Sequence, residues 1–355
     1  MKALVLAGGL GTRLRPFSHS MPKQLIPIAN KPVLVHVLED LRAVGIKKIG
    51  IIVGDRAAEI AAVLGDGSAL GVEITYVRQD KPLGLAHCVR IARGFLGDDD
   101  FVMYLGDNML AEGLHHMVEE FEACRPSAQV VVHKVADPRA FGVAEVDENG
   151  GVVRLVEKPQ EPRSDLAVIG VYIFTSAVHA AVDAIGPSAR GELEITDALQ
   201  WLVSSGADVR ARIYSGYWKD TGRVEDVLDC NRELLDRLLP SVLGDVDSVS
   251  VLEGSVVIEA GARVVRSRVI GPVVIGAGSL VEDSRIGPHT AIGRDCVLKE
   301  AGVGYSIMLD GARVQRVDGI SSSVVGRDAS VYSATPAHCG RLVVGDHSMV
   351  EVAAF

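Results

Sequence analysis

The chain has 355 residues, of which 48% are apolar and 23% charged, so we expect a globular protein of about two domains rather than a disordered chain. Its formal charge of −10 argues against nucleic acid or an anionic membrane as the main partner. The scattered cysteines indicate neither a disulfide framework nor a zinc site, and without a signal peptide or an apolar run of roughly 18 residues we expect a cytoplasmic protein.

The first predicted element is a strand that runs into the glycine-rich stretch AGGLGTRLRP. Because glycine has no Cβ, such a loop can bring backbone N–H groups close to an anion. The third glycine of a dinucleotide fingerprint and the Gly-Lys-Ser/Thr of a Walker A loop are both missing. A plain turn between strand and helix is the alternative, but the nearby cations Arg13, Arg15 and Lys23 favour a polyphosphate ligand.

Short aliphatic strands and amphipathic helices alternate up to about residue 239, which predicts an α/β domain with a mixed, mainly parallel sheet. The expected strands are Ala3–Leu6, Ile49–Val53, Ile74–Val77 and Phe101–Leu105. The expected helices are Val33–Ala43, Ala57–Leu64, Leu85–Ala92, Leu114–Ala123 and Val224–Leu239, the last of which stops at Pro240. In FGVAEVDENGGVVRLVEKP we predict a hairpin with Asn149-Gly150 as its left-handed turn.

The stretch RQDKPLGLAH places Gln79 at a strand end, shortly before Gly84 and a helix start. A side-chain amide can donate one hydrogen bond and accept another, which matches the O4 and N3–H edge of thymine or uracil. An isolated glutamine is usually an exposed loop residue, so this interpretation depends on the neighbouring motifs.

Acidic side chains follow further along the chain. Asp107 ends a strand in LGDN, and Asp220 lies in YWKDTG. Two such carboxylates can hold one Mg²⁺ together with phosphate oxygens and water, although each alone could be a turn or cap residue. Glu157 and Lys158 in VEKP, with Glu194 in RGELEITD, suit sugar hydroxyls and a second phosphate.

Beyond Pro240 the sequence period changes. An aliphatic residue followed by glycine and other small or turn-forming residues recurs at Ile258, Ile275, Ile286, Ile292, Val325 and Val344. Ile286, Ile292 and Leu298 are spaced as hexapeptide repeats require, with one aliphatic side chain per side pointing inward. We therefore expect a parallel β-helix over residues 240–355, after a catalytic domain over residues 1–239.

The motifs GGLGTRLRP, PKQLIPI, NKP, PLGLAH, LGDN, FGV, VEKP, GELEITD and WKDTG occur in this order. In this order they resemble the sugar-phosphate nucleotidyltransferases over nearly the whole chain. The chain is most similar to the long-form thymidylyltransferases of antibiotic deoxysugar pathways, which act on glucose 1-phosphate. The resemblance implies a Rossmann-like nucleotidyltransferase domain followed by a left-handed parallel β-helix.

The resemblance also implies roles for residues. Those that would bind the nucleotide are Gly8, Gly11, Thr12, Arg13, Lys23, Gln24, Gln79 and Gly84. Those that would bind the sugar phosphate are Asn108, Gly142, Glu157, Lys158, Val168 and Glu194. Asp107 and Asp220 would bind Mg²⁺ and, with Arg13 and Lys23, support catalysis. Phe141 stands where many short-form relatives have tyrosine, so a hydroxyl contact at that position is not expected.

The implied reaction is attack of the sugar 1-phosphate on the α-phosphorus of dTTP, which gives dTDP-glucose and pyrophosphate without a protein nucleophile. The expected partners are dTTP, glucose 1-phosphate, Mg²⁺ and further copies of the chain in a dimer or tetramer. All the recognised motifs precede Pro240, so we expect the β-helix to serve assembly or regulation.

Other functions stay open. UTP could replace dTTP, and a galactosamine, glucosamine or cyclitol phosphate could replace glucose 1-phosphate. A non-catalytic regulatory homologue would be free to lose the charged residues that this chain keeps. A bifunctional enzyme with an acyltransferase β-helix would have only His289, His338 and His347 as bases in that part.

Overall fold

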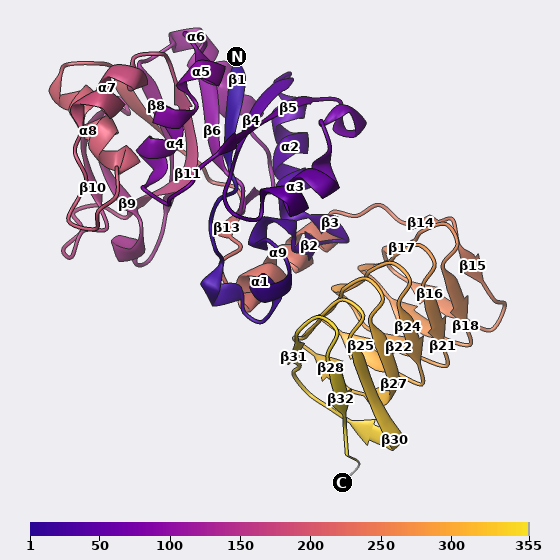
Figure 1. Cartoon of the computed structure of the whole chain (residues 1–355). Coiled ribbons are helices and arrows are strands. Elements are labelled where there is room, and N and C mark those ends of the chain that lie inside the picture. Colours follow the sequence, from indigo (N-terminus) through magenta and orange to yellow (C-terminus); the bar gives the residue numbers. More distant parts are fainter. Residues whose placement is uncertain (354–355) are drawn as a thin grey trace. The chain divides into compact units, whose positions relative to one another are not determined.

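The computed structural model describes residues 1–353, which form two compact units (Figure 1). Unit 1 comprises Met1–Gly9 and Leu34–Lys219, and unit 2 comprises Leu10–Val33 together with residues 220–353. The predicted boundary after residue 239 lies where the sequence motifs change. The two units are defined by contacts within the structure instead, and residues 10–33 belong to the same unit as the β-helix. No helix among the described residues is long and apolar enough to span a membrane.

Unit 1 is built on a nine-stranded sheet whose main path has the order β10-β9-β11-β6-β1-β4-β5, while β8 pairs with β11 and β12. β10 and β11 run antiparallel to their neighbours, and the other strands share one direction, so the sheet is mixed and mainly parallel. Its strands are β1 (Lys2–Leu6), β4 (Lys48–Val53), β5 (Glu73–Arg78), β6 (Phe101–Leu105), β8 (Ala128–Lys134), β9 (Gly142–Val146), β10 (Val152–Glu157), β11 (Leu166–Phe174) and β12 (Val209–Ile213).

Side chains on both faces of the central strands are buried, as continuous aliphatic runs require. Leu4 packs in a cluster with residues of α4, α7 and α8, whereas Val5 and Leu34 of α2 both approach Gly106 from the other face. The helices of unit 1 are α2 (Val33–Ala43), α3 (Ala57–Leu64), α4 (Leu85–Ile91), α5 (Arg93–Leu96), α6 (His115–Cys124), α7 (Val178–Ala184) and α8 (Ile195–Ser204), with short 3-10 turns η3 (Ser68–Leu70) and η4 (Pro138–Ala140).

The predicted strands and helices of unit 1 are present with small shifts at their ends. The predicted hairpin is present as β9 and β10, but Gly150 has a φ of 80° whereas Asn149 is not left-handed. The Asp147 carboxylate accepts the backbone N–H groups of Asn149 and Gly151, which stabilises this turn differently from the expected Asn-Gly type.

Unit 2 begins with a loop segment, residues 10–33, which we call the signature loop. It contains η1 (Thr12–Leu14), α1 (Phe17–Ser20), η2 (Lys23–Leu25) and the small hairpin of β2 (Pro27–Ile28) and β3 (Lys31–Pro32). The chain returns to unit 2 at the end of β13 (Trp218–Asp220) and continues into α9 (Val224–Asp236). α9 ends three residues before the predicted end at Leu239, so Pro240 does not itself stop the helix.

The rest of unit 2 is a parallel β-helix of three stacked sheets, which fits the left-handed form (Figure 1). The first sheet has β14 (Ser241–Val242), β17 (Val256–Ile258), β20 (Val273–Ile275), β23 (Thr290–Ile292), β26 (Ile307–Met308), β29 (Val324–Val325) and β31 (Val343–Val344). The second has β15 (Asp245–Val246), β18 (Arg263–Val265), β21 (Leu280–Glu282), β24 (Val297–Lys299), β27 (Arg313–Asp318), β30 (Ser330–His338) and β32 (Met349–Glu351). The third has β16 (Val251–Glu253), β19 (Arg268–Ile270), β22 (Arg285–Ile286), β25 (Gly302–Gly304) and β28 (Ile320–Ser321).

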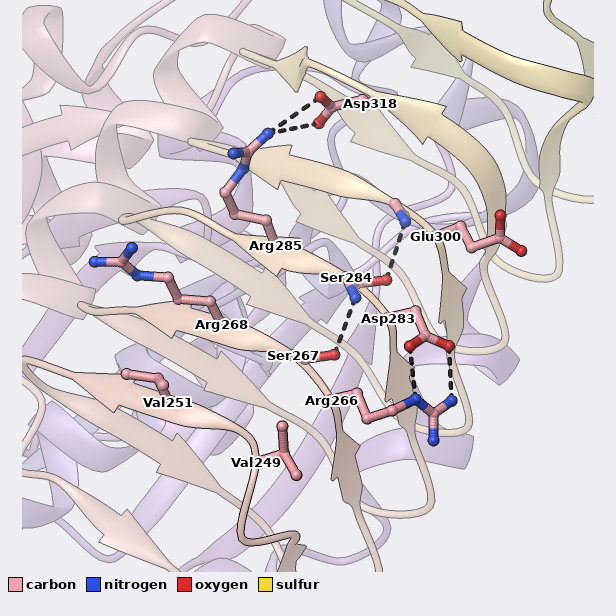
Figure 2. A pocket seen from close by; sticks show the side chains of 11 residues that line it. Val249, Val251, Arg266, Ser267, Arg268, Asp283, Ser284, Arg285, Glu300 and Asp318 are labelled. Carbon is pink, nitrogen blue, oxygen red and sulfur yellow. Dashed lines mark hydrogen bonds and ion pairs between the residues drawn. The ribbon is translucent and has the colours of Figure 1, made fainter.

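The hexapeptide spacing has the predicted structural meaning. Ile286, Ile292 and Leu298 lie on β22, β23 and β24, one on each of the three sheets, and all are 0% exposed. Serine hydroxyls reinforce one corner: Ser267 Oγ accepts from the Ser284 N–H, which lies 17 residues further along, and Ser284 Oγ accepts from the Ala301 N–H (Figure 2). Each coil is therefore held mainly by the coils on either side of it.

Candidate active site

The predicted phosphate-binding residues of unit 2 lie in the signature loop. Gly11 has a φ of 65°, and a Cβ at this position would lie 2.8 Å from Lys23 Cβ. Any larger residue would therefore be strained and would displace the lysine. Gly11 thus brings the start of the first 3-10 turn, Thr12–Leu14, against the side chain of Lys23 at the start of the second.

Arg13 lies beside Asp220, the predicted metal ligand of the same unit. Its Nη2 atom is 3.5 Å from Asp220 Oδ2, and its side chain is 60% exposed. A Cβ on Gly222 would lie 2.8 Å from Arg13 Nη2, so that glycine leaves room for the guanidinium. The structure therefore brings Arg13 and Asp220 together, as a pair open enough to meet a ligand.

Gln24, also predicted to lie near the nucleotide, is only 1% exposed. Its Oε1 atom is buried and has no hydrogen-bond partner among the described residues. An unpaired buried carbonyl oxygen costs free energy, of the order of 1–3 kcal/mol, so its presence needs a functional or structural reason.

In unit 1, the predicted base-binding residues Gln79 and Gly84 lie together with Gly8. The Gln79 Nε2 atom is 3.1 Å from His87 Nδ1 and 3.5 Å from Gly84 O, while Gln79 Oε1 is 3.5 Å from the position of a Cβ on Gly8. The nitrogen of the Gln79 amide is thus held by residues of the same segment, Gly84 and His87. Sequence reasoning missed His87, although it belongs to the same PLGLAH motif.

Gly84 also connects this region to the sugar-binding motif. Its φ is 101°, and a Cβ there would lie 2.4 Å from Leu193 O. Leu193 accepts from Ala86 N and donates to Leu83 O, so RGELEITD runs alongside PLGLAH. This close backbone approach explains why the position requires glycine.

Asp107 lies between β6 and β7 (Asn108–Leu110), and Asn108 begins β7. Asn108 is 4% exposed; its amide nitrogen donates to Asp107 Oδ1 at 3.2 Å, and its oxygen accepts from Trp218 Nε1 at 2.8 Å. Trp218 also packs edge-on against Phe141, with ring centroids 5.5 Å apart. Asn108 therefore orients the carboxylate of Asp107. Phe141 packs against Trp218 through its ring, a contact that needs no hydroxyl group.

Three other predicted sugar-binding residues meet at one point. A Cβ on Gly142 would lie 3.4 Å from Glu157 Oε2, 3.7 Å from Val168 Cβ and 2.6 Å from Thr196 Cγ2. The Thr196 hydroxyl donates to Glu157 Oε2 at 3.1 Å. Thr196, which sequence reasoning did not select, therefore fixes the carboxylate of Glu157.

Glu157, Lys158 and Glu194 are joined through Arg190, a third residue that sequence reasoning missed. Glu157 Oε1 is 3.4 Å from Lys158 Nζ and 3.3 Å from Arg190 Nη1, and Arg190 Nε is 3.5 Å from Glu194 Oε1. Burial raises the pKa of Glu194, whereas the hydrogen bond from Ser188 opposes that rise. The arrangement offers two cations for an anionic group and two carboxylates for hydroxyl groups.

A groove of about 670 Å³ on the β-helix contains none of the predicted site residues. Its arginines are balanced by acids: Arg266 pairs with Asp283, and Arg285 pairs with Asp318 (Figure 2). The histidines of the β-helix do not form a shared centre in the described residues, because His289 bonds Asp236 and His347 lies 3.7 Å from Asp328.

The chain matches the family described as "Nucleotidyl transferase" over residues 2–237. It is 54% identical over 353 residues to a glucose-1-phosphate thymidylyltransferase of Streptomyces griseus, with 99% of both chains covered. It is 51% identical over 354 residues to another of that name from Streptomyces antibioticus, again with 99% of both covered.

Among solved structures, a chain from Bacillus anthracis assigned to the same activity is 37% identical, with a TM-score of 0.61 over 65% of this chain and 94% of that one. A UDP-glucose pyrophosphorylase complexed with UDP-glucose is 26% identical, with a TM-score of 0.60 over 66% of this chain and 98% of that one. From the matched domain and the nearly full-length relatives, the chain belongs to the nucleotidyl transferase family.

Proposed function

We propose that this protein is a glucose-1-phosphate thymidylyltransferase, which transfers a nucleotidyl group from dTTP to glucose 1-phosphate and releases pyrophosphate. The observation that carries the proposal is the match of 54% identity over 99% of the chain to an enzyme of that name. The sequence supports it, because the charged residues that this chemistry needs are all present. Its product, an activated glucose, would be the starting point for deoxysugars.

On the nucleotide side, we propose that the backbone around Gly11, with Arg13 and Lys23, binds the triphosphate. Both substrates are anions, so the two cations lower the repulsion that would keep them apart. The buried Gln24 Oε1 is a candidate acceptor for a nucleotide hydroxyl or N–H group. Gln79 would recognise the base edge, with Gly8 and Gly84 allowing close approach.

On the sugar side, we propose that Lys158 and Arg190 bind the phosphate of glucose 1-phosphate. Glu157 and Glu194 would accept hydrogen bonds from sugar hydroxyls, with Thr196 and Ser188 holding their carboxylates in place. The remaining proposed contacts are Asn108, the Gly142 backbone and Val168. These residues align the attacking phosphate oxygen, and no side chain needs to act as a nucleophile.

The family uses a divalent metal, and we propose Mg²⁺ with Asp107 and Asp220 as its protein ligands. The described residues contain no group of three or more His, Cys, Asp or Glu side chains placed to hold a metal. Two aspartates nevertheless fit Mg²⁺, which commonly binds through one or two carboxylates, water and substrate phosphates. When bound, the ion would supply positive charge to the phosphates.

A pyrophosphate-release assay tests the function. It would combine the protein, Mg²⁺ and glucose 1-phosphate with dTTP, UTP, GTP, CTP or ATP in turn. We expect activity with dTTP, weaker activity with UTP, and little with the others, because thymine and uracil share the edge that Gln79 would read. No release with any nucleotide would favour a non-catalytic homologue, and a clear preference for another base would overturn the assignment of dTTP.

We also propose a homo-oligomer, a dimer or a tetramer, because the β-helix presents exposed strand edges and apolar residues such as Leu243, which is 72% exposed. Light scattering of the purified chain would measure the subunit number.

A further inference from the structure

The signature loop is held by the β-helix at a buried charged contact. Asp346 lies in the turn after β31, and its side chain is only 1% exposed. Its Oδ2 atom accepts from the Ser20 hydroxyl at 2.8 Å and from Arg327 Nε at 2.8 Å, while Oδ1 accepts from the Arg327 backbone N–H at 2.8 Å. A carboxylate this deeply buried requires such partners, and one of them comes from the signature loop.

Arg327 completes this contact. Its Nη2 atom donates to the Ser20 backbone carbonyl at 3.2 Å, so the last residue of α1 is held through both its hydroxyl and its carbonyl. Gly345 lies against Pro16, since a Cβ there would be 3.2 Å from Pro16 Cβ. We call Ser20, Arg327 and Asp346 the clasp.

A second contact holds the other end of the loop. Ala29 and Asn30 form the tip of the β2–β3 hairpin with φ values of 48° and 63°. Asn30 Nδ2 donates to Ile292 O of the β-helix at 2.6 Å, and Ala29 N donates to Oδ1 of Asn231 on α9 at 2.9 Å. Asn231 is fully buried and also donates to His289 O at 3.3 Å.

Lys23 and Gln24 lie between these two contacts, and Arg13 lies seven residues before Ser20 in the same loop. If the β-helix served only to bring subunits together, an apolar surface would be enough to pack against the loop. The clasp instead uses directional hydrogen bonds at a buried carboxylate, which fix an orientation as well as a position.

We propose that Arg327 and Asp346 are positioning residues for the nucleotide phosphates. The clasp holds the backbone between Arg13 and Lys23 in the conformation that binds the triphosphate, so the β-helix contributes to the reaction by positioning this loop. This role rests on the function proposed above. It also gives the β-helix a part in catalysis beyond the assembly or regulation expected from sequence.

The test uses the full chain with Ser20→Ala, Ser20→Thr and Asp346→Asn. Asp283→Asn is the matched control, because Asp283 pairs with Arg266 on the same β-helix but lies in the groove of Figure 2. We expect Ser20→Ala and Asp346→Asn to raise the KM for dTTP roughly tenfold, since small displacements of binding groups have large effects. We expect the KM for glucose 1-phosphate, measured on the same preparation, to change by less than about twofold.

Ser20→Thr keeps a hydroxyl and should restore most of the lost dTTP affinity, which general loss of structure would not explain. If Asp346→Asn does not fold, the two Ser20 variants carry the test. An equal KM for dTTP in wild type, folded Ser20→Ala and the control would overturn the inference. A similar rise in KM for both substrates would also overturn it.

Hydrogen exchange in the absence of substrate separates this inference from the proposed function. We expect the peptide that spans residues 10–25 to exchange faster in Ser20→Ala than in wild type or Asp283→Asn. If the wild type shows no transfer with dTTP, the proposed function fails while the exchange result still tests the clasp. Unchanged exchange in that peptide would overturn the clasp even in an active enzyme.

Discussion

The sheet of unit 1 and the β-helix of unit 2 both consist largely of parallel strands, but they use sequence differently. In the β-helix, each aliphatic residue meets the equivalent residue of the next coil, as Ile275 meets Ile292. In unit 1, neighbouring strands come from distant segments, as β1 pairs with β6. A short repeat therefore suffices to build the β-helix, whereas the proposed substrate site of unit 1 needs residues from many separate motifs.

The signature loop stands outside this contrast. It carries Arg13 and Lys23, which we assign to the nucleotide, yet other residues of the loop are hydrogen-bonded to α9 and the β-helix. A regular scaffold thus supports an irregular functional segment, as is common where binding residues lie on loops.

The largest expected effect tests the proposed metal ligands. Asp107→Asn and Asp220→Asn should each reduce turnover by roughly 100-fold or more, because each removes a charge from the proposed metal site. Steady-state rates over a range of Mg²⁺ concentrations would measure this. Asp208→Asn, at an exposed acid paired with Arg210, serves as the control. Near-normal Mg²⁺-dependent rates in both variants would remove the metal assignment.

A core substitution tests the repeat rule of the β-helix. Ile292 is 0% exposed, so Ile292→Ala should lower the free energy of unfolding by about 2–5 kcal/mol. Val343→Ala, at a side chain that is 38% exposed, should lower it by much less. Denaturant unfolding would compare the two. A similar decrease in the free energy of unfolding in both variants would show that the inward-facing aliphatic side chains do not contribute the stability assigned to them.

The base-reading role of Gln79 predicts a smaller effect. Gln79→Ala should raise the KM for dTTP several-fold, as expected for the loss of a hydrogen bond worth about 1 kcal/mol, or weaken the preference over CTP. Competition assays between dTTP and CTP would measure it. An unchanged preference would place Gln79 outside the base pocket.

The smallest expected effect concerns Glu194. Burial raises the pKa of this acid in the folded state, so the folded protein binds more protons than the unfolded chain and loses stability as pH rises from the unfolded pKa through the folded one. Glu194→Gln should therefore unfold at higher denaturant concentration than wild type at pH 7, with a smaller difference near pH 4, while its KM for glucose 1-phosphate rises. A larger gain at the lower pH would contradict the assigned direction of the pKa shift.

Local sequence patterns predicted much of the fold. The helices Val33–Ala43 and Ala57–Leu64 have the predicted ends, and the spacing of Ile286, Ile292 and Leu298 matches the three sheets. The predicted end of α9 at Leu239 was wrong. The helix ends at Asp236, before the proline that was expected to stop it. The hairpin and its left-handed Gly150 were predicted correctly, but Asn149 is not left-handed, and the Asp147 carboxylate accepts the N–H groups of Asn149 and Gly151.

Long-range contacts could not be predicted in the same way. Arg190 joins Glu157, 33 residues away, to Glu194, and nothing in RGELEITD by itself indicates this bridge. Ser20 and Asp346 are 326 residues apart, and both look like ordinary turn residues in the sequence. Such pairs depend on how the folded segments meet, which local patterns do not specify.

Transfer of labelled phosphorus tests the proposed reaction most directly. The protein would be incubated with glucose 1-phosphate, Mg²⁺ and dTTP labelled either at the α- or at the γ-phosphorus, and the products separated. Attack on the α-phosphorus predicts that the α label appears in dTDP-glucose and the γ label in pyrophosphate. A γ label in a phosphorylated sugar, or no labelled sugar nucleotide from a folded and Mg²⁺-supplied protein, would contradict the assignment of this chain as a thymidylyltransferase.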